Sequence, residues 1–249
     1  MQKLANKVVV VTGASKGIGA GIAKRAAAEG AKVVVNYASG SEDAARVVAE
    51  IQARGGRAIA VQANVTQADD IKRLFQETKR AYDKLDVLVN NAGVFAFQPL
   101  GQITEAEFSR QFGVNVLGPL LVMQEALNYF GSEGGSVINI SSVVSELAPP
   151  GSSVYSGTKG ALDSITRVWA KELASRKIRV NTIAPGAVET EGAHAAGMVG
   201  SDFINEVIKQ TPLGRLGQPD DVARVALFLA SEESGWLTGE RLSASGGFR

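Results

Sequence analysis

The sequence contains no cysteine, which excludes disulfide bonds and metal sites built from thiolates. We predict no bound metal, and the absence of cysteine fits the reducing cytoplasm. An excess of one charge is also lacking, because 26 Lys and Arg residues nearly balance 25 Asp and Glu residues. The resulting net charge of +1 indicates neither a nucleic-acid partner nor an anionic membrane surface.

Long hydrophobic runs are missing as well. The run nearest the N-terminus, Val8–Val11, is too short for the core of a signal peptide or for a membrane span. We therefore expect a soluble protein of the cytoplasm. The 249 residues, 45% of them apolar, are enough for one complete hydrophobic core, and no linker or repeat divides them. We predict one domain over residues 1–249.

Short runs rich in β-branched residues alternate with longer amphipathic stretches. This alternation is typical of a doubly wound α/β fold, in which helices cover both faces of a parallel sheet of about seven strands. The predicted strands are Val8–Val11, Lys32–Asn36, Arg57–Val61, Val87–Asn90, Ser136–Ile140, Arg179–Ile183 and Arg241–Ala244. The predicted helices are Ile18–Glu29, Glu42–Arg54, Gln67–Tyr82, Glu105–Tyr129, Tyr155–Ser175 and Asp220–Ala230.

Two of these helices carry a start signal. Thr66 with Asp69, and Thr104 with Glu107, have the spacing of a capping box. In such a box the hydroxyl and the carboxylate bond to backbone N–H groups at the helix start. This spacing supports helix starts after Thr66 and Thr104.

Glycines follow the first predicted strand at positions Gly13, Gly17 and Gly19. Glycine allows a tight turn and lets the backbone approach a pyrophosphate, whose charge then lies at the N-terminus of a helix. Glycine-rich turns also occur without a nucleotide. The position directly after the first strand nevertheless favours a dinucleotide site.

Three reactive side chains occur close together in the second half of the chain. Ser142 follows a predicted strand, and Tyr155 and Lys159 are one helical turn apart, so that the phenol and the ammonium share one helix face. A nearby cation favours the phenolate, so we expect Lys159 to lower the pKa of Tyr155 from about 10 towards neutrality. Ser142 could hold a substrate oxygen while Tyr155 exchanges a proton with it. A Tyr-x-x-x-Lys pair alone is often only a surface contact.

Together with the glycine loop, Ser142, Tyr155 and Lys159 resemble the short-chain dehydrogenase/reductase family, and the resemblance extends over nearly the whole chain. It implies a Rossmann-type fold and a hydride transfer between a nicotinamide cofactor and an alcohol or carbonyl. It also implies that Asn115 kinks the long helix and holds a water beside the lysine. The implied catalytic set is Asn115, Ser142, Tyr155 and Lys159. Relatives are mostly tetramers, so we expect a homotetramer.

The choice of cofactor depends on the residues after the second predicted strand. A carboxylate there would bind the 2′-hydroxyl of NAD and repel the 2′-phosphate of NADP, but Val35–Gly40 contains no acid. Asn36 and Ser39 could receive the phosphate, and Lys16 lies where related NADP-dependent enzymes carry a basic residue. We therefore predict NADP(H) as the cofactor.

Further cofactor contacts are implied by the resemblance. Asn64 replaces the usual aspartate of the family and could accept from the adenine amino group through its amide oxygen. The backbone of Val188 would orient the nicotinamide amide, and Thr190 would contact the amide or the diphosphate. Besides Tyr155 and Lys159, the predicted cofactor contacts are Gly13, Ser15, Lys16, Gly17, Ile18, Gly19, Asn36, Tyr37, Ser39, Asn64, Val65, Asn91, Ala92, Gly93, Pro185, Gly186, Val188 and Thr190.

Residues 189–210 are predicted to form a mobile lid over the substrate, because Glu191–Ser201 is rich in glycine and alanine. The only histidine, His194, lies in this lid. A lone histidine is more often a surface or wall residue than a catalyst, so we leave it out of the catalytic set. The residues expected to line a mainly apolar substrate pocket are Phe95, Phe97, Ser145, Leu147, His194 and Met198.

We therefore predict an NADPH-dependent reductase of a ketone or keto ester, reversible as an alcohol dehydrogenase, with Tyr155 as general acid and base. One alternative is the 3-oxoacyl-acyl-carrier-protein reductase of fatty-acid synthesis, which needs basic residues near the site to receive an acidic carrier. Lys171 and Arg176 could serve, but Leu127–Gly135 at the end of the long helix lacks Lys and Arg. A second alternative is a non-catalytic dinucleotide-binding protein, in which we would expect the tyrosine or the lysine to be lost.

Overall fold

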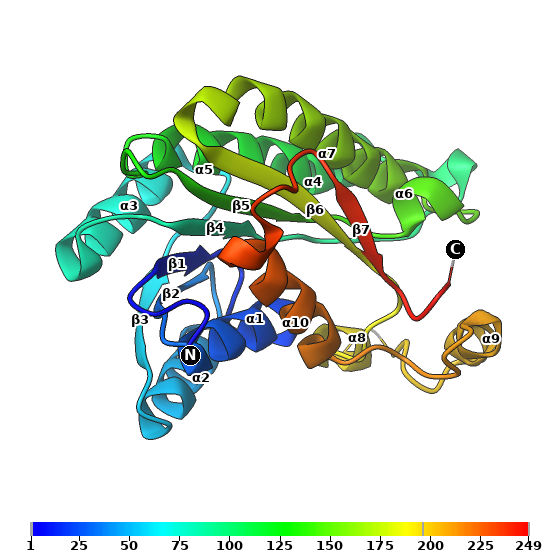
Figure 1. Cartoon of the computed structure of the whole chain (residues 1–249). Helices are drawn as coiled ribbons and strands as arrows, with labels where there is room; N and C mark the ends of the chain where they lie inside the picture. The colour runs from blue at the N-terminus through cyan, green and yellow to red at the C-terminus, as the bar shows by residue number, and fades with distance from the viewer. Residues whose placement is uncertain (1, 196, 249) are drawn as a thin grey trace.

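The computed structural model describes residues 2–195 and 197–248. Its centre is a parallel sheet with the strand order β3-β2-β1-β4-β5-β6-β7 (Figure 1). The strands are β1 (Val8–Val11), β2 (Lys32–Tyr37), β3 (Arg57–Gln62), β4 (Val87–Asn90), β5 (Gly135–Ile140), β6 (Ile178–Pro185) and β7 (Arg241–Ala244). The order reverses between β1 and β4, and this reversal point is where doubly wound folds bind ligands. The predicted fold class is confirmed.

Helices cover both faces of the sheet (Figure 1). They are α1 (Gly17–Ala28), α2 (Ser41–Ala53), α3 (Ala68–Tyr82), α4 (Glu105–Phe112), α5 (Gly118–Ala126), α6 (Val144–Leu147), α7 (Ser153–Glu172), α8 (Glu191–Ala195), α9 (Asp202–Gln210) and α10 (Pro219–Ala230). Within the described residues, none of them combines the length and the apolarity that crossing a membrane requires.

Two hydrophobic cores form because side chains alternate between the faces of a strand. Val9 and Val11 of β1 pack with α1, α2 and α10, whereas Val10 packs on the opposite face with α3, α5 and α7. Both faces of the central strands are therefore buried. This burial explains why their sequences are continuous apolar runs.

The long helix predicted over residues 105–129 is interrupted. A π-helical turn, Gly113–Leu117, separates α4 from α5, and α5 ends at Ala126. Asn115 lies in this turn, where its amide bonds to both the N–H and the carbonyl of Val94, each at 2.8 Å. Pro119 near the start of α5 has no N–H to donate to the preceding turn. The Asn115 side chain, which bonds outside the helix, and the missing N–H of Pro119 together explain the π-helical turn.

Only one of the two predicted helix starts has the expected cap. The Thr104 hydroxyl accepts from the Glu107 N–H at 3.2 Å, while the Glu107 carboxylate pairs with a neighbouring arginine. The prediction for Thr66 was wrong, because α3 begins later and Gln67 stands at its N-cap position. The Thr66 hydroxyl donates instead to Asn64 Oδ1 at 3.0 Å.

The segment predicted as a lid contains α8 and α9, which lie beyond the carboxyl end of β6 (Figure 1). Gly197 and Gly200, both with positive φ, lie between the two helices. Residue 196 is outside the described residues. The mobility of this segment stays a prediction.

Gly135, at the start of β5, offers a test of core packing. A Cβ there would lie 2.6 Å from a ring carbon of Phe130 and would overlap the Asp86 carbonyl oxygen. We expect Gly135→Ala to lower the free energy of unfolding by about 1–3 kcal/mol, because the core must shift to admit the methyl group. Gly101→Ala is the control, since nothing lies within 4 Å of its Cβ position. Equal urea-unfolding midpoints for the two variants would contradict the packing described here.

Candidate active site

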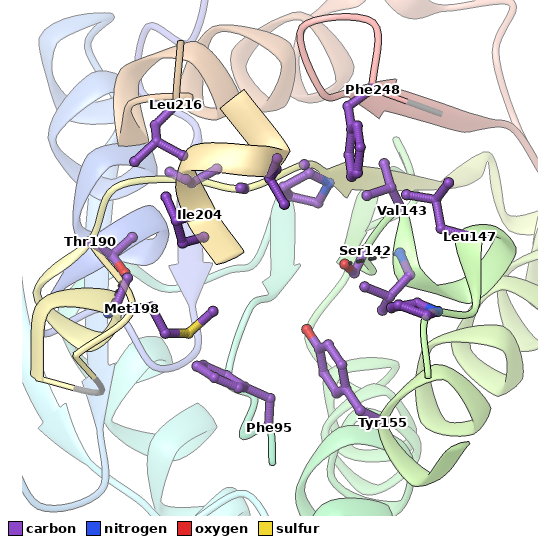
Figure 2. A pocket seen from close by; sticks show the side chains of 18 of the residues that line it. Phe95, Ser142, Val143, Leu147, Tyr155, Thr190, Met198, Ile204, Leu216 and Phe248 are labelled. Carbon is purple, nitrogen blue, oxygen red and sulfur yellow. Dashed lines mark hydrogen bonds between the residues drawn. The ribbon is translucent and has the colours of Figure 1, made fainter. Parts of the chain in front are cut away.

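The predicted catalytic side chains meet at the carboxyl end of β5. Tyr155 and Lys159 lie in the first turns of α7, and Ser142 lies two residues beyond the strand. Lys159 is 5% exposed, and its ammonium donates to the carbonyl of Ile140 at 2.9 Å. Its nitrogen lies 5.7 Å from the centre of the Tyr155 ring. Figure 2 shows the hydroxyls of Ser142 and Tyr155 facing the same cavity.

Asn115 links the elements that form this site by side-chain hydrogen bonds. Besides its two bonds to Val94, its amide donates to the Thr158 hydroxyl at 3.1 Å, and Thr158 directly precedes Lys159. The π-helical turn thus links the loop after β4 to α7. The structure establishes this bracing role for Asn115, and the predicted water beside the lysine stays a prediction.

Burial sets the protonation of the two catalytic residues. Removal of the phenol from water raises the pKa of Tyr155 to about 12, against a smaller opposing effect of its hydrogen bond to Ser142. Burial also lowers the pKa of Lys159 to about 8, and the negative charge of Asp163 opposes this shift. The expectation that Lys159 lowers the pKa of Tyr155 is wrong, because desolvation of the buried phenol dominates. The Tyr155 phenol is therefore protonated at neutral pH.

The glycine loop lies across the carboxyl ends of β1 and β4. Gly13 and Gly17 adopt φ values of 61° and 58°, which favour glycine. A Cβ at Gly13 would lie 2.8 Å from the Cα of Ala92. The Asn91 amide fastens the loop by donating to the carbonyls of Thr12 and Gly13 at 2.8 and 2.9 Å. The loop can therefore bring its backbone close to a bound group.

The first turn of α1 has the character of an anion site. No acidic residue lies in that turn, and the N-cap residue Lys16 makes no side-chain cap. The Gly17 N–H donates to a carboxylate oxygen of Glu191, 2.9 Å away, from the segment after β6. The N-terminus of a helix attracts negative charge, so a phosphate could bind where the Glu191 carboxylate lies. These residues fit the diphosphate of a dinucleotide.

A cavity of about 530 Å³ opens between the catalytic residues, the end of β6 and α9 (Figure 2). Predicted cofactor contacts that line it are Ile18, Asn91, Gly93, Pro185, Gly186, Val188 and Thr190. Predicted substrate contacts that line it are Phe95, Phe97, Leu147 and Met198.

Two predicted pocket residues lie outside this lining. Ser145 donates to the Asp163 carboxylate at 2.7 Å, and His194 pairs with Glu189 at 3.0 Å on the exposed surface. Their hydrogen-bonding groups are thus engaged with partners outside the cavity.

Comparison with known proteins agrees with this geometry. A family model described as enoyl-(acyl carrier protein) reductase matches residues 13–249. A short chain dehydrogenase/reductase of Aspergillus aculeatus is 43% identical over 98% of this chain and 96% of its own length. The chain belongs to the short-chain dehydrogenase/reductase family. Among the relatives are an uncharacterized oxidoreductase of Methylorubrum extorquens, 57% identical over the full length of both chains, and the tetrahydroxynaphthalene reductase of Pyricularia oryzae, 39% identical over 98% of this chain and 90% of that protein.

A solved structure of the same family shows the same architecture. The angucycline C-6 ketoreductase LanV with bound NADP superposes with a TM-score of 0.92 at 36% identity, and the match covers 99% of this chain and 96% of LanV.

The structure corrects one cofactor contact predicted for this short-chain dehydrogenase/reductase. Asn36 is only 1% exposed, its oxygen accepts from the Gly13 N–H at 3.2 Å, and its amide nitrogen donates to the Ala63 carbonyl at 3.0 Å. The side chain therefore binds the glycine loop to the sheet and cannot receive a phosphate. Lys16 and Ser39 are exposed, so they remain candidates for that role.

Asn64 also differs from the expectation. Its amide oxygen accepts from the N–H and the hydroxyl of Thr66, at 3.1 and 3.0 Å. This oxygen is already used in a local turn, so it must leave that turn before it can accept from an adenine. The signal that could have indicated this is local, because an asparagine side chain often accepts from the N–H two residues further on.

Several lining residues were missed by sequence reasoning. Phe248 near the C-terminus and Ile204, Glu206 and Val207 of α9 all face the cavity. Figure 2 shows Phe248 across the cavity from Phe95. The amphipathic pattern of residues 202–210 could have identified α9, but no local signal connects the C-terminus with the active site.

Glu191 provides a test of the anion site. We expect Glu191→Gln to tighten NADPH binding about two- to fivefold, because a neutral amide competes less with the diphosphate for the start of α1. The dissociation constant can be measured by titration of NADPH fluorescence. Glu189→Gln is the matched control, since this neighbouring carboxylate bonds to His194 and Gln218 and not to the glycine loop. Equal tightening in both variants would disprove the specific role of Glu191.

Proposed function

We propose that this chain is an NADPH-dependent carbonyl reductase, reversible as an alcohol dehydrogenase. The observation that carries the proposal is the convergence of the Ser142 and Tyr155 hydroxyls on one cavity beside the buried Lys159 ammonium. NADP(H) is supported by the absence of an acid after β2, by the exposed Lys16 in the glycine loop and by the NADP held in LanV.

The residues of the site supply the proton chemistry of this reaction. When bound, NADPH supplies the hydride for the ketone carbon. The protonated Tyr155 donates its proton to the ketone oxygen, and the Ser142 hydroxyl holds that oxygen by a hydrogen bond. The phenolate left on Tyr155 is stabilised by the positive charge of Lys159. Asn115 keeps the start of α7 in place while this happens.

The walls of the cavity indicate an uncharged, mainly apolar ketone or keto ester. Phe95 and Phe97 flank Tyr155 with ring centres 6.0 and 6.2 Å from the phenol ring. Such a wall suits an aromatic or otherwise flat substrate. The names of the relatives agree, since tetrahydroxynaphthalene reductase and angucycline ketoreductase both act on fused rings.

A carrier-linked substrate is the second candidate and is less well supported. Among the described residues that line the cavity, Lys159 is the only cation, and the Glu206 carboxylate lies there too. Lys171 and Arg176, the basic residues available for a carrier, are not part of the lining. A phosphate-bearing arm would therefore be repelled by the Glu206 carboxylate, and the one basic group near it, Lys159, already donates to the Ile140 carbonyl. A non-catalytic role is disfavoured because Asn115, Ser142, Tyr155 and Lys159 are all present.

The same proposal includes a homotetramer in the cytoplasm. Large apolar side chains are half exposed on α4, α5, the turn between them and α7, at Phe108, Leu117, Leu120 and Val168. An apolar face of this kind is stabilised when a second copy covers it. Light scattering at micromolar concentration tests the oligomer, and a monomer would exclude the tetramer.

The proposal also includes a lid. Helices α8 and α9 already line the cavity, and we propose that they close over it.

The first test of function is NADPH oxidation at 340 nm with a panel of substrates. We expect turnover of fused-ring ketones and keto esters and weak turnover of an acetoacetyl-carrier mimic, because the cavity is apolar and lacks a phosphate partner. Parallel assays with NADH should give a KM at least about tenfold higher, since no carboxylate receives the 2′-hydroxyl. Activity confined to the carrier mimic would place the enzyme in fatty-acid synthesis. A preference for NADH would refute the cofactor assignment.

The proton donor is tested with Tyr155→Phe. We expect kcat to fall by more than about 10²-fold, because the donor is lost, while the dissociation constant for NADPH stays within about twofold. Tyr129→Phe is the matched control, because Tyr129 bonds to Glu125 on α5 and lies outside the cavity lining. Turnover that survives in Tyr155→Phe would show that another group delivers the proton.

A further inference from the structure

A buried ion pair lies next to the active site but takes no part in the chemistry above. Arg241 begins the edge strand β7, and its Nε lies 3.1 Å from Oδ2 of Asp163 on α7. The two side chains are only 15% and 8% exposed. Burial of two charges costs desolvation energy that a hydrophobic pair would not cost. Stability alone is therefore a weak reason for this pair.

The same guanidinium also donates hydrogen bonds to the turn that contains Ser142. Its Nη2 donates to the Ser142 carbonyl at 3.3 Å and to the Ser145 hydroxyl at 3.2 Å. The Ser145 hydroxyl in turn lies 2.7 Å from Oδ2 of Asp163. Arginine can make these contacts together because its donors form a rigid planar fork. Strand β7, the Ser142 turn and helix α7 are thus joined at one side chain.

Asp163 connects the pair to Lys159. The two residues are one helical turn apart on α7, so they share a face of the helix. The negative charge of Asp163 raises the pKa of Lys159 against the effect of burial. Oδ1 of Asp163 has no hydrogen-bond partner in the described part of the chain, so the carboxylate is only partly neutralised.

Among the described residues, Asp163 is the charged group whose effect on the pKa of Lys159 is resolved. Tyr155 and Asp163 belong to its own helix, and Arg241 reaches in from β7. Glu146 of α6 lies 3.0 Å from Arg241, but its side chain is 70% exposed and therefore well screened. The groups that face Lys159 from β5 and from the π-helical turn are uncharged, namely the Ile140 carbonyl and the Asn115 amide.

We propose that Arg241 is a positioning residue for the reductase reaction, on the function proposed above. Its hydrogen bond to the Ser142 carbonyl fixes the position of the Ser142 hydroxyl. Its ion pair partly neutralises the negative charge of Asp163, which acts on Lys159. Both effects reach the substrate only through Ser142 and Lys159.

The proposal predicts opposite responses to two substitutions. Arg241→Met removes a cation and frees the carboxylate, so the pKa of Lys159 should rise. Asp163→Asn removes the carboxylate, so the same pKa should fall. The double variant should lie between the two singles. The pKa is followed by NMR in chain labelled with [13C]-lysine, with the Lys159 signal assigned by its loss in Lys159→Arg. This readout is independent of turnover, so a failure of the proposed activity would not hide it.

Turnover gives the second measurement. In Arg241→Met, kcat should fall about 10- to 100-fold through misplacement of Ser142, while NADPH affinity stays within about twofold. Arg241→Lys should recover part of the loss, because it restores the charge. Arg224→Met is the matched control, since its pair with Asp220 is exposed. Should Arg241→Met match this control in kcat and in the pKa of Lys159, and differ only in melting temperature, the pair is purely structural and the proposal is wrong.

Discussion

The hydrogen bond from the buried Lys159 ammonium to the Ile140 carbonyl is the contact on which the active site depends. It joins the first turns of α7 to the end of β5, and the Asn139 amide of β5 makes a second buried bond to the Thr166 hydroxyl of α7 at 2.8 Å. A buried ammonium needs such an acceptor, because an unpaired charge in the interior costs several kcal/mol. Once α7 is held in this way, Tyr155 and Ser142 face the same cavity.

Burial then decides what the site can do. The phenol of Tyr155 stays protonated far above neutral pH, with a pKa of about 12, so it is suited to proton donation. The ammonium of Lys159, with a pKa of about 8, remains largely charged at pH 7 and can stabilise the phenolate after the transfer. In the proposed reaction, this protonation favours reduction, and the reverse reaction requires the tyrosine proton to leave first.

Three asparagines support this arrangement at the carboxyl edge of the sheet. Asn91 and Asn36 tie the glycine loop to β4 and β3, and Asn115 ties the loop after β4 to α7. An amide side chain can donate and accept at once, so it replaces the backbone bonds that strands lose where they end. This explains why Asn36, expected as a phosphate ligand, acts as a brace: it lies inside β2, where its side chain points into the fold.

The sequence by itself determined the features that depend on neighbours along the chain. The alternation of strands and helices, the glycine turn after β1 and the spacing of Tyr155 and Lys159 follow from local periodicity and backbone freedom, and the structure confirms them. Tertiary structure alone decided which distant groups meet. The bonds of Asn115 to Val94 and Thr158, the place of Phe248 in the cavity and the pair of Arg241 with Asp163 each join segments far apart in sequence, although the family resemblance had implied the kink at Asn115 itself. Their energies arise only after the sheet has formed, so no local pattern predicts them.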